Sequence, residues 1–161
     1  MKRLAAIILL LALLPLTASA SLPEPVTAEQ LPQALTVFIN AYNSFADTFA
    51  VQHLPFDGWN KHNSYYYVSI GNVDYQFRED SYGTTAAIIA TQENANLDFL
   101  AECACISAAV YGFTPDIYTD LMTVYIALRT TPKGENVQHK SSGGIMLMTD
   151  RGDLIAFMVT K

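Results

Sequence analysis

Apolar residues recur every three or four positions between residues 31 and 49, which is the period of a helix that buries one face. The residues at these positions are Leu31, Leu35, Phe38, Tyr42, Phe45 and Phe49. Just before them, Thr27 and Gln30 have the spacing of a capping box, and Pro32 suits a first helical turn. The pattern predicts a helix laid across a sheet by its aromatic face. The alternative is that this face lines a ligand site.

A period of two, typical of strands, follows a loop predicted over residues 53–64. Residues 65–70 and 73–79 are rich in aromatic and β-branched side chains, and the Gly-Asn pair between them predicts a hairpin turn. In the second strand apolar and polar residues alternate, which predicts one buried face and one solvent-exposed face. A further turn and a third strand are predicted over residues 80–91.

The helical period then returns for two more helices. Asn94 or Asn96 is a suitable cap for the first, which is expected to run to about Tyr111 and to stop at Gly112. Its many alanines make it slim, so we expect other elements to pack around most of it. The sequence Thr114-Pro115-Asp116 predicts the start of the second helix. The apolar stripe of that helix is Ile117, Leu121, Val124 and Leu128.

Residues 130–143 are predicted to form an irregular, mobile loop, and two strands follow at 144–149 and 154–160. These strands are almost continuously apolar, as is typical of the middle of a sheet, and the turn between them contains Arg151-Gly152-Asp153. The whole order is α-β-β-β-α-α-β-β. It predicts a single α+β domain with an antiparallel sheet of about five strands and helices packed on it.

The N-terminus has the three parts of a secretory signal: basic residues, an apolar run over residues 4–16, and the small residues Ala18-Ser19-Ala20. We therefore expect residues 1–20 to be a cleavable signal peptide and residues 21–161 to form the exported domain. The periplasm is the favoured location and the extracellular medium is the alternative. Because Ser21 is not a cysteine, no lipid attachment is predicted, and no stable membrane anchor is expected after cleavage.

Acidic residues outnumber basic ones, with 15 Asp and Glu against 9 Lys and Arg and a formal charge of −6. Loss of Lys2 and Arg3 with the signal peptide would leave 7 basic residues and a formal charge of −8. A domain of this charge repels the phosphates of nucleic acids and of anionic lipids. We therefore expect no nucleic-acid partner and no docking on anionic membranes.

Cys103 and Cys105 are the two cysteines of the chain, too few for a disulfide framework. Residues two apart on a helix point about 200° away from each other, so a bond between these two would require a broken helix. We interpret them as buried free thiols that pack as small apolar groups. A redox pair or a soft-metal site is the alternative.

Residues that carry chemistry follow no established pattern. His53, His62 and His139, with Asp57, do not have the spacing of a zinc site, so no metal and no cofactor are expected. We find no serine elbow, no phosphate-binding glycine pattern and no pair of facing carboxylates, and therefore assign no catalytic residue. For a hydrolase-like enzyme with a site assembled from loop residues, the candidates are Asp57, His62 and His139.

Five aromatic residues gather around the start of the first predicted strand. They are Phe56, Trp59, Tyr65, Tyr66 and Tyr67. Aromatic rings with polar tips suit sugar faces and peptide backbones, so these residues are the predicted ligand-binding site. The alternative interpretation is that Trp59 simply covers the edge of the sheet.

These observations favour a non-enzymatic binding or interaction module of the cell envelope, whose partner is a protein or a small ligand. The envelope enzyme described above is the first alternative. The second alternative is a self-associating scaffold protein, which would have a large exposed apolar patch that a second copy covers.

Overall fold

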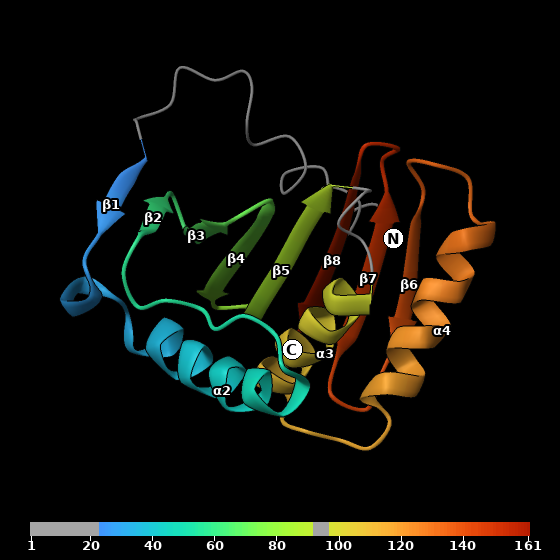
Figure 1. Ribbon diagram of the computed structural model, residues 1–161, viewed down its shortest axis with the longest axis horizontal. Helices are drawn as coiled ribbons and strands as arrows, with labels where there is room; N and C mark the ends of the chain where they lie inside the picture. Colours follow the sequence, from blue (N-terminus) through green and yellow to red (C-terminus); the bar gives the residue numbers. More distant parts are fainter. Residues whose placement is uncertain (1–22, 92–96) are drawn as a thin grey trace.

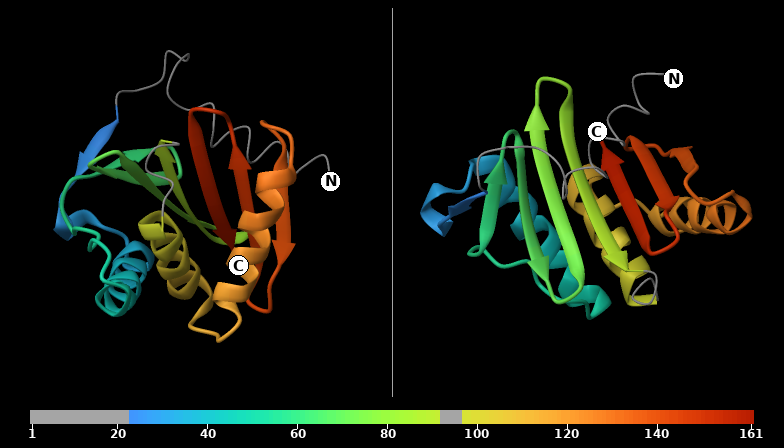
Figure 2. Two further views of the ribbon diagram at one scale, coloured as in Figure 1. Left: turned by 45° about the vertical axis from the view of Figure 1, so that its right-hand side comes forward. Right: turned by 90° about the horizontal axis from the view of Figure 1, so that it is seen from above.

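Strands from both halves of the chain form one antiparallel sheet, and three helices lie against one of its faces (Figures 1 and 2). The computed structural model describes residues 23–91 and 97–161. The predicted signal peptide at residues 1–20, Ser21, and the predicted helix caps Asn94 and Asn96 lie outside the described residues.

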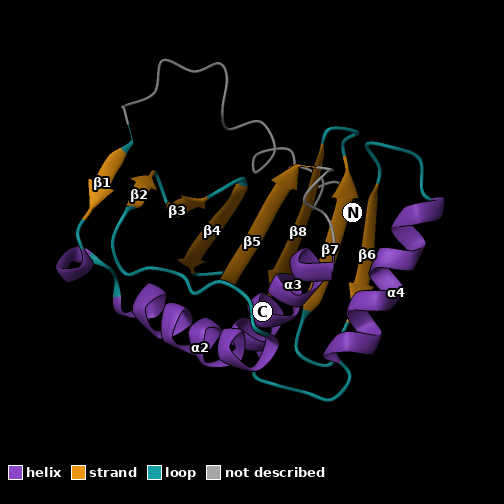
Figure 3. Cartoon of the chain, in the orientation of Figure 1, coloured by secondary structure: helices purple, strands orange, loops and turns teal. Residues whose placement is uncertain are grey.

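The elements follow one another in the order that Figure 3 shows by type. They are β1 (Glu24–Val26), the short 3-10 helix η1 (Ala28–Gln30), α2 (Gln33–Phe49), β2 (Trp59–His62), β3 (Tyr65–Ile70), β4 (Val73–Asp80), β5 (Gly83–Thr91), α3 (Leu97–Tyr111), α4 (Ile117–Thr130), β6 (Asn136–Lys140), β7 (Ile145–Asp150) and β8 (Leu154–Thr160). The spatial order of the strands is β1-β2-β3-β4-β5-β8-β7-β6.

The α+β class, the antiparallel sheet and the three main helices are confirmed, but the prediction of about five strands is wrong because the sheet has eight. The additional strands are β1, β2 and β6, which have only 3, 4 and 5 residues. Such short strands with polar residues lack the apolar alternation of a longer strand, so their sequences look like loops. Residues 53–64 and 130–143, both predicted as loops, therefore contribute β2 and β6 respectively.

The hairpins and the central position of the C-terminal strands agree with the sequence pattern. Ile70 pairs with Val73 around the predicted turn, where Gly71 has a φ of +60°. Both β7 and β8 have a neighbouring strand on each side. In the turn between them, Gly152 has a φ of +94° and its N–H donates to the Asp150 carboxylate at 2.6 Å. The Arg151-Gly152-Asp153 sequence is thus part of a hairpin turn.

The main core lies between the sheet and the helices. The aromatic face of α2 meets β4, where the Phe38 and Phe77 rings are 5.0 Å apart and the Tyr42 and Tyr75 rings 6.0 Å apart. The slim helix α3 lies between α2 and α4 and also packs on β5 and β8, which confirms its expected central position. All four residues of the predicted α4 stripe are buried. None of the helices within residues 23–91 and 97–161 has the length and apolar character needed to cross a bilayer.

The helix α4 is tied to the edge strand β6 by a pair of polar side chains. The Nε2 of His139 lies 2.8 Å from the Oδ1 of Asp120, and the two side chains are 30% and 17% exposed. A second pair of the same kind, His53 and Asp47, has a distance of 2.7 Å but is 53% and 73% exposed. Because water competes less for a partly buried pair, only the first should contribute to stability.

We expect His139→Ala to lower the free energy of unfolding by about 1–2 kcal/mol, since it leaves the Asp120 carboxylate without its partner in a partly buried position. The matched control His53→Ala should leave stability unchanged within error. Urea denaturation at neutral pH, followed by circular dichroism, measures both effects. Equal losses in the two variants would contradict the assigned role of the His139 pair.

Candidate functional site

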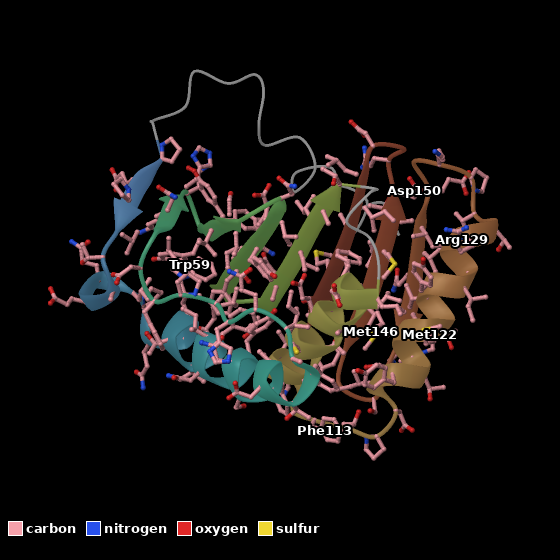
Figure 4. All side chains as sticks on the ribbon, viewed as in Figure 1. Trp59, Phe113, Met122, Arg129, Met146 and Asp150 are labelled. Carbon is pink, nitrogen blue, oxygen red and sulfur yellow. The ribbon has the colours of Figure 1, made fainter. Side chains whose placement is uncertain are left out.

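The aromatic residues predicted as a ligand site lie on different faces of the sheet. Trp59 is fully buried in the main core, and its indole N–H donates to the carbonyl of Pro55 at 2.7 Å. Figure 4 shows Trp59 among the side chains between α2 and the sheet. Phe56, in the preceding loop, is 39% exposed. The tryptophan thus packs in the core, while the phenylalanine ring reaches solvent.

The three tyrosines of β3 alternate between the two faces, as neighbours on a strand must. Tyr66 pairs with Phe77 on the helix-covered face, whereas Tyr67 pairs with Gln76 on the opposite face. Tyr65 also lies on the opposite face, where its hydroxyl accepts a hydrogen bond from Arg78 at 2.7 Å. The five predicted residues are therefore not brought together on one surface.

The three residues considered for an enzyme are also separated. His62 is on β2 and His139 is on β6, with five strands between them. At about 4.8 Å per strand, these two positions are roughly 29 Å apart. The Asp57 carboxylate accepts a hydrogen bond from the backbone N–H of Ala28 at 3.2 Å, near the edge of the sheet that β1 forms. Within the described parts of the chain, no three His, Cys, Asp or Glu residues are close enough to hold a metal ion.

Cys103 and Cys105 are both buried, and neither is in a disulfide. Burial, with the charge of Glu102 as a smaller cause, raises the pKa of both thiols, that of Cys105 to about 12. Both cysteines are therefore protonated at neutral pH, and a protonated thiol is a poor nucleophile and metal ligand. In this environment the two side chains act as small apolar groups of the core.

A buried polar cluster joins the two helices to the sheet beside these cysteines. It consists of Tyr42 on α2, Tyr75 on β4 and Glu102 on α3. The pKa of Glu102 is raised, mainly by burial. The hydrogen bond from Tyr75 lowers this pKa, and the negative charge of Asp98 raises it further. The pKa values of both tyrosines are raised as well, mainly by burial. We interpret this cluster as a structural contact between helices and sheet.

An open groove of about 570 Å³ lies at the end of the sheet where α2 begins and the β4–β5 hairpin turns. This volume is within the range of sites that hold small ligands. Polar and apolar atoms contribute about equally to its surface, and the apolar lining residues are Ala34, Val37 and Phe38 from α2, Phe77 from β4, and Ala109 and Val110 from α3. The polar residues of the lining are Gln33, Glu79, Thr84 and Lys161.

Strand register explains why the polar residues lie together. Thr84 pairs with Glu79 on one side, and on the other side it exchanges two backbone hydrogen bonds with Lys161, at 3.0 and 3.2 Å. Glu79, Thr84 and Lys161 thus form one row across the strand ends, and Phe77 lies on the same face, two residues before Glu79. The groove combines an apolar floor with a rim that carries one acidic and one basic side chain.

The groove is hollow because small side chains line both of its walls. Ala34 on α2 and Ala109 on α3 leave space that a larger residue would fill, and Val37 at the mouth is 60% exposed. Sequence reasoning did not identify these residues as a site. An available signal was Val37, an apolar residue of α2 that lies outside the predicted buried stripe.

Comparisons with known proteins add no family to this description, since no protein-family model, no curated protein and no solved structure matches the chain. The geometry of the described residues is therefore the basis for assigning a function.

The Glu102→Gln variant tests the interpretation of the buried polar cluster. Because the folded protein holds the pKa of Glu102 above its ordinary value of 4.5, this carboxyl favours folding below that pH. The contribution is lost as pH rises through the folded-state pKa. We expect Glu102→Gln to be more stable than the wild type at pH 7.5, by a few degrees in Tm, and to lack this part of the pH dependence. Thermal unfolding between pH 4 and 8 measures it.

A matched control is Glu79→Gln, which removes one carboxylate from an exposed position on β4. It should change the pH dependence of stability much less than Glu102→Gln does. Identical pH profiles for the wild type and Glu102→Gln would contradict the role assigned to the buried carboxyl.

Proposed function

We propose that this protein is an exported, non-enzymatic binding module of the cell envelope that holds the apolar part of a small amphipathic ligand in the groove between α2, α3 and the β4–β5 hairpin. The observation that carries the proposal is an open groove whose surface is about half apolar and half polar, with Glu79 and Lys161 among its lining residues. Export rests on the signal-like N-terminus, and the periplasm is the favoured location.

The apolar floor supports binding of a hydrocarbon or aromatic group. Phe38 and Phe77, which are only 4% and 2% exposed, form a tilted ring pair at the base, whereas Val37 is 60% exposed. A ligand that covers Val37 and the partly buried Ala34 and Ala109 removes apolar surface from water, which contributes about 25 cal/mol for each Å² buried. The groove is partly formed in advance, so little ordering of the protein is needed on binding.

The rim supports recognition of a polar end on the same ligand. Lys161 and Glu79 are both exposed, and neither side chain forms an ion pair within the described residues. The Lys161 ammonium group is available to an anionic or hydrogen-bond-accepting group, and Glu79 to a donor. An apolar ligand with a polar head would therefore have partners at both ends.

The fluorescent probe 8-anilinonaphthalene-1-sulfonate has this chemistry, with aromatic rings and one anionic group. We expect the folded protein to bind one probe molecule in the groove. Val37→Asp should weaken binding at least about tenfold, because it places a charge against the apolar floor. Asn40→Asp is the matched control, since it adds the same charge at an exposed position of α2 outside the groove lining and should weaken binding far less.

Fluorescence titration measures both affinities, and circular dichroism verifies that both variants are folded. Equal affinities of the Val37→Asp and Asn40→Asp variants for the probe would overturn the proposed groove site. Loss of probe binding in a Met122→Ser variant, on the distant outer side of α4, would also overturn it.

The rim charges give a second, independent prediction. Lys161→Ala should weaken binding of the anionic probe about threefold to tenfold, and Glu79→Gln should strengthen it, because the two residues attract and repel the sulfonate respectively. Both effects should shrink as ionic strength rises from 0.02 to about 0.5 M. Fluorescence titrations at the two salt concentrations measure the affinities. If neither substitution changes the affinity for the probe, the probe does not contact the rim.

A further inference from the structure

The rim of the groove carries two opposite charges that are not paired with each other. Glu79 lies near the end of β4 and Lys161 directly follows β8, and both are exposed. Thr84 of β5 lies between them, since it pairs with Glu79 on one side and with the backbone of Lys161 on the other. Neither charged side chain forms an ion pair within residues 23–91 and 97–161. We refer to Glu79, Thr84 and Lys161 as the rim row.

The backbone of Lys161 is fixed in the rim row by two contacts. Its N–H and its carbonyl oxygen bond to Thr84 at 3.0 and 3.2 Å. A Cβ atom at Gly83 would collide with the carbonyl oxygen of Lys161, so the missing side chain at position 83 lets Lys161 approach the β4–β5 hairpin this closely. The fold therefore sets the position from which the ammonium group extends, relative to Glu79 in the same hairpin.

The spacing of the rim row indicates how far apart the charges of a matching ligand are. Neighbouring strands are about 4.8 Å apart, so Glu79 and Lys161 are separated by roughly 10 Å across the row. Side chains stand roughly perpendicular to a sheet, so the charged ends keep a similar separation. One charge-assisted hydrogen bond of about 2.8 Å at each end leaves roughly 4 Å between two ligand groups that face these residues. A phosphate and an ammonium group joined by a short linker have about this separation.

The two rim charges select the kind of head group that fits. An anionic head is attracted by Lys161 but repelled by Glu79, and for a cationic head the two effects are reversed. An uncharged head displaces water from both charged side chains without replacing it by an opposite charge. A zwitterionic head, in contrast, pairs with both residues at once, so it is the complementary partner of the rim row.

We propose that the groove binds a single-chain lipid with a zwitterionic head of the phosphoethanolamine kind. Its phosphate group faces Lys161 and its ammonium group faces Glu79. Its hydrocarbon chain lies between α2 and α3, along Ala34, Val37 and Ala109. This inference rests on the groove function proposed above and names the ligand class of that same site.

The size of the groove favours a lipid over an amino acid that carries the same two charges. An α-amino acid with an apolar side chain is also zwitterionic, but both of its charged groups are attached to the same carbon atom and lie closer together than the rim row requires. The groove volume of about 570 Å³ is within the range of sites that hold drug-sized ligands. A single hydrocarbon chain with its head group fills such a space better than one amino acid does.

Two lysophospholipids that differ only in the end of the head group test the inference. The probes are 1-lauroyl lysophosphatidylethanolamine, which is zwitterionic, and 1-lauroyl lysophosphatidylglycerol, which is anionic. We expect the protein to bind the ethanolamine lipid at least about fivefold more tightly than the glycerol lipid. Isothermal titration calorimetry below the critical micelle concentrations measures both affinities. Equal affinities, or tighter binding of L-phenylalanine than of the ethanolamine lipid, would overturn the assignment.

Glu79→Gln should change the two affinities in opposite directions. It should weaken binding of the ethanolamine lipid about threefold to tenfold, because the ammonium group loses its charged partner, and strengthen binding of the glycerol lipid, because a repulsion is removed. Asp74→Asn is the matched control, since it removes a carboxylate from the opposite face of the same strand and should preserve the preference. If Glu79→Gln changes both affinities by the same factor, Glu79 does not face the ammonium group and the assignment is wrong.

Val37→Asp separates a failure of this inference from a failure of the groove itself. It should weaken binding of both lipids at least about tenfold, because both place the same hydrocarbon chain against this residue. If it does so while the two lipids bind the wild type equally well, the groove is the binding site and the zwitterionic head is wrong. If neither lipid binds, or if Val37→Asp changes neither affinity in protein shown by circular dichroism to be folded, the groove and the inference are both wrong.

Discussion

The contact between the aromatic side of α2 and strand β4 is the interaction on which the rest of the structure depends. Phe38 lies against Phe77 and Tyr42 against Tyr75, so two ring pairs fix the distance and angle between the helix and the sheet. Such pairs add about 0.5–1.5 kcal/mol each beyond the burial of their surface. The groove begins where this contact ends, at the first turn of α2.

A helix as slim as α3 permits this arrangement. It lies between α2 and α4, and its alanines and cysteines let both neighbours approach closely. The same small residues have a second consequence at the end of the helix, where Ala109 opposes Ala34 of α2 and leaves the groove open. One compositional feature therefore produces a tightly packed centre and an unfilled space at its border.

The groove and the exposed side of α4 are separate surfaces. The groove is concave and small, with charged residues at its rim, which suits a small ligand. Tyr118, Met122 and Ile126 on α4 are also exposed, but none of them belongs to the groove lining.

The sequence alone was sufficient for features that depend on local periodicity. The aromatic face of α2, the buried stripe of α4, the stop at Gly112 and the apolar β7–β8 hairpin all follow from spacing and turn chemistry within a few residues. The α+β class followed from the order of these elements. In contrast, β1, β2 and β6 are held mainly by hydrogen bonds to strands that precede or follow them, and a short polar segment carries no periodic sign of this pairing.

Only the tertiary structure decided which residues share a surface. Phe56, Trp59 and the tyrosines of β3 are neighbours in the sequence, yet strand geometry divides them between the core, a loop and two faces of the sheet. The groove, in turn, joins Val37, Phe77, Ala109 and Lys161 from four distant segments. Local patterns determine which side of an element is apolar, but the position of that element relative to the others depends on packing between distant parts of the chain.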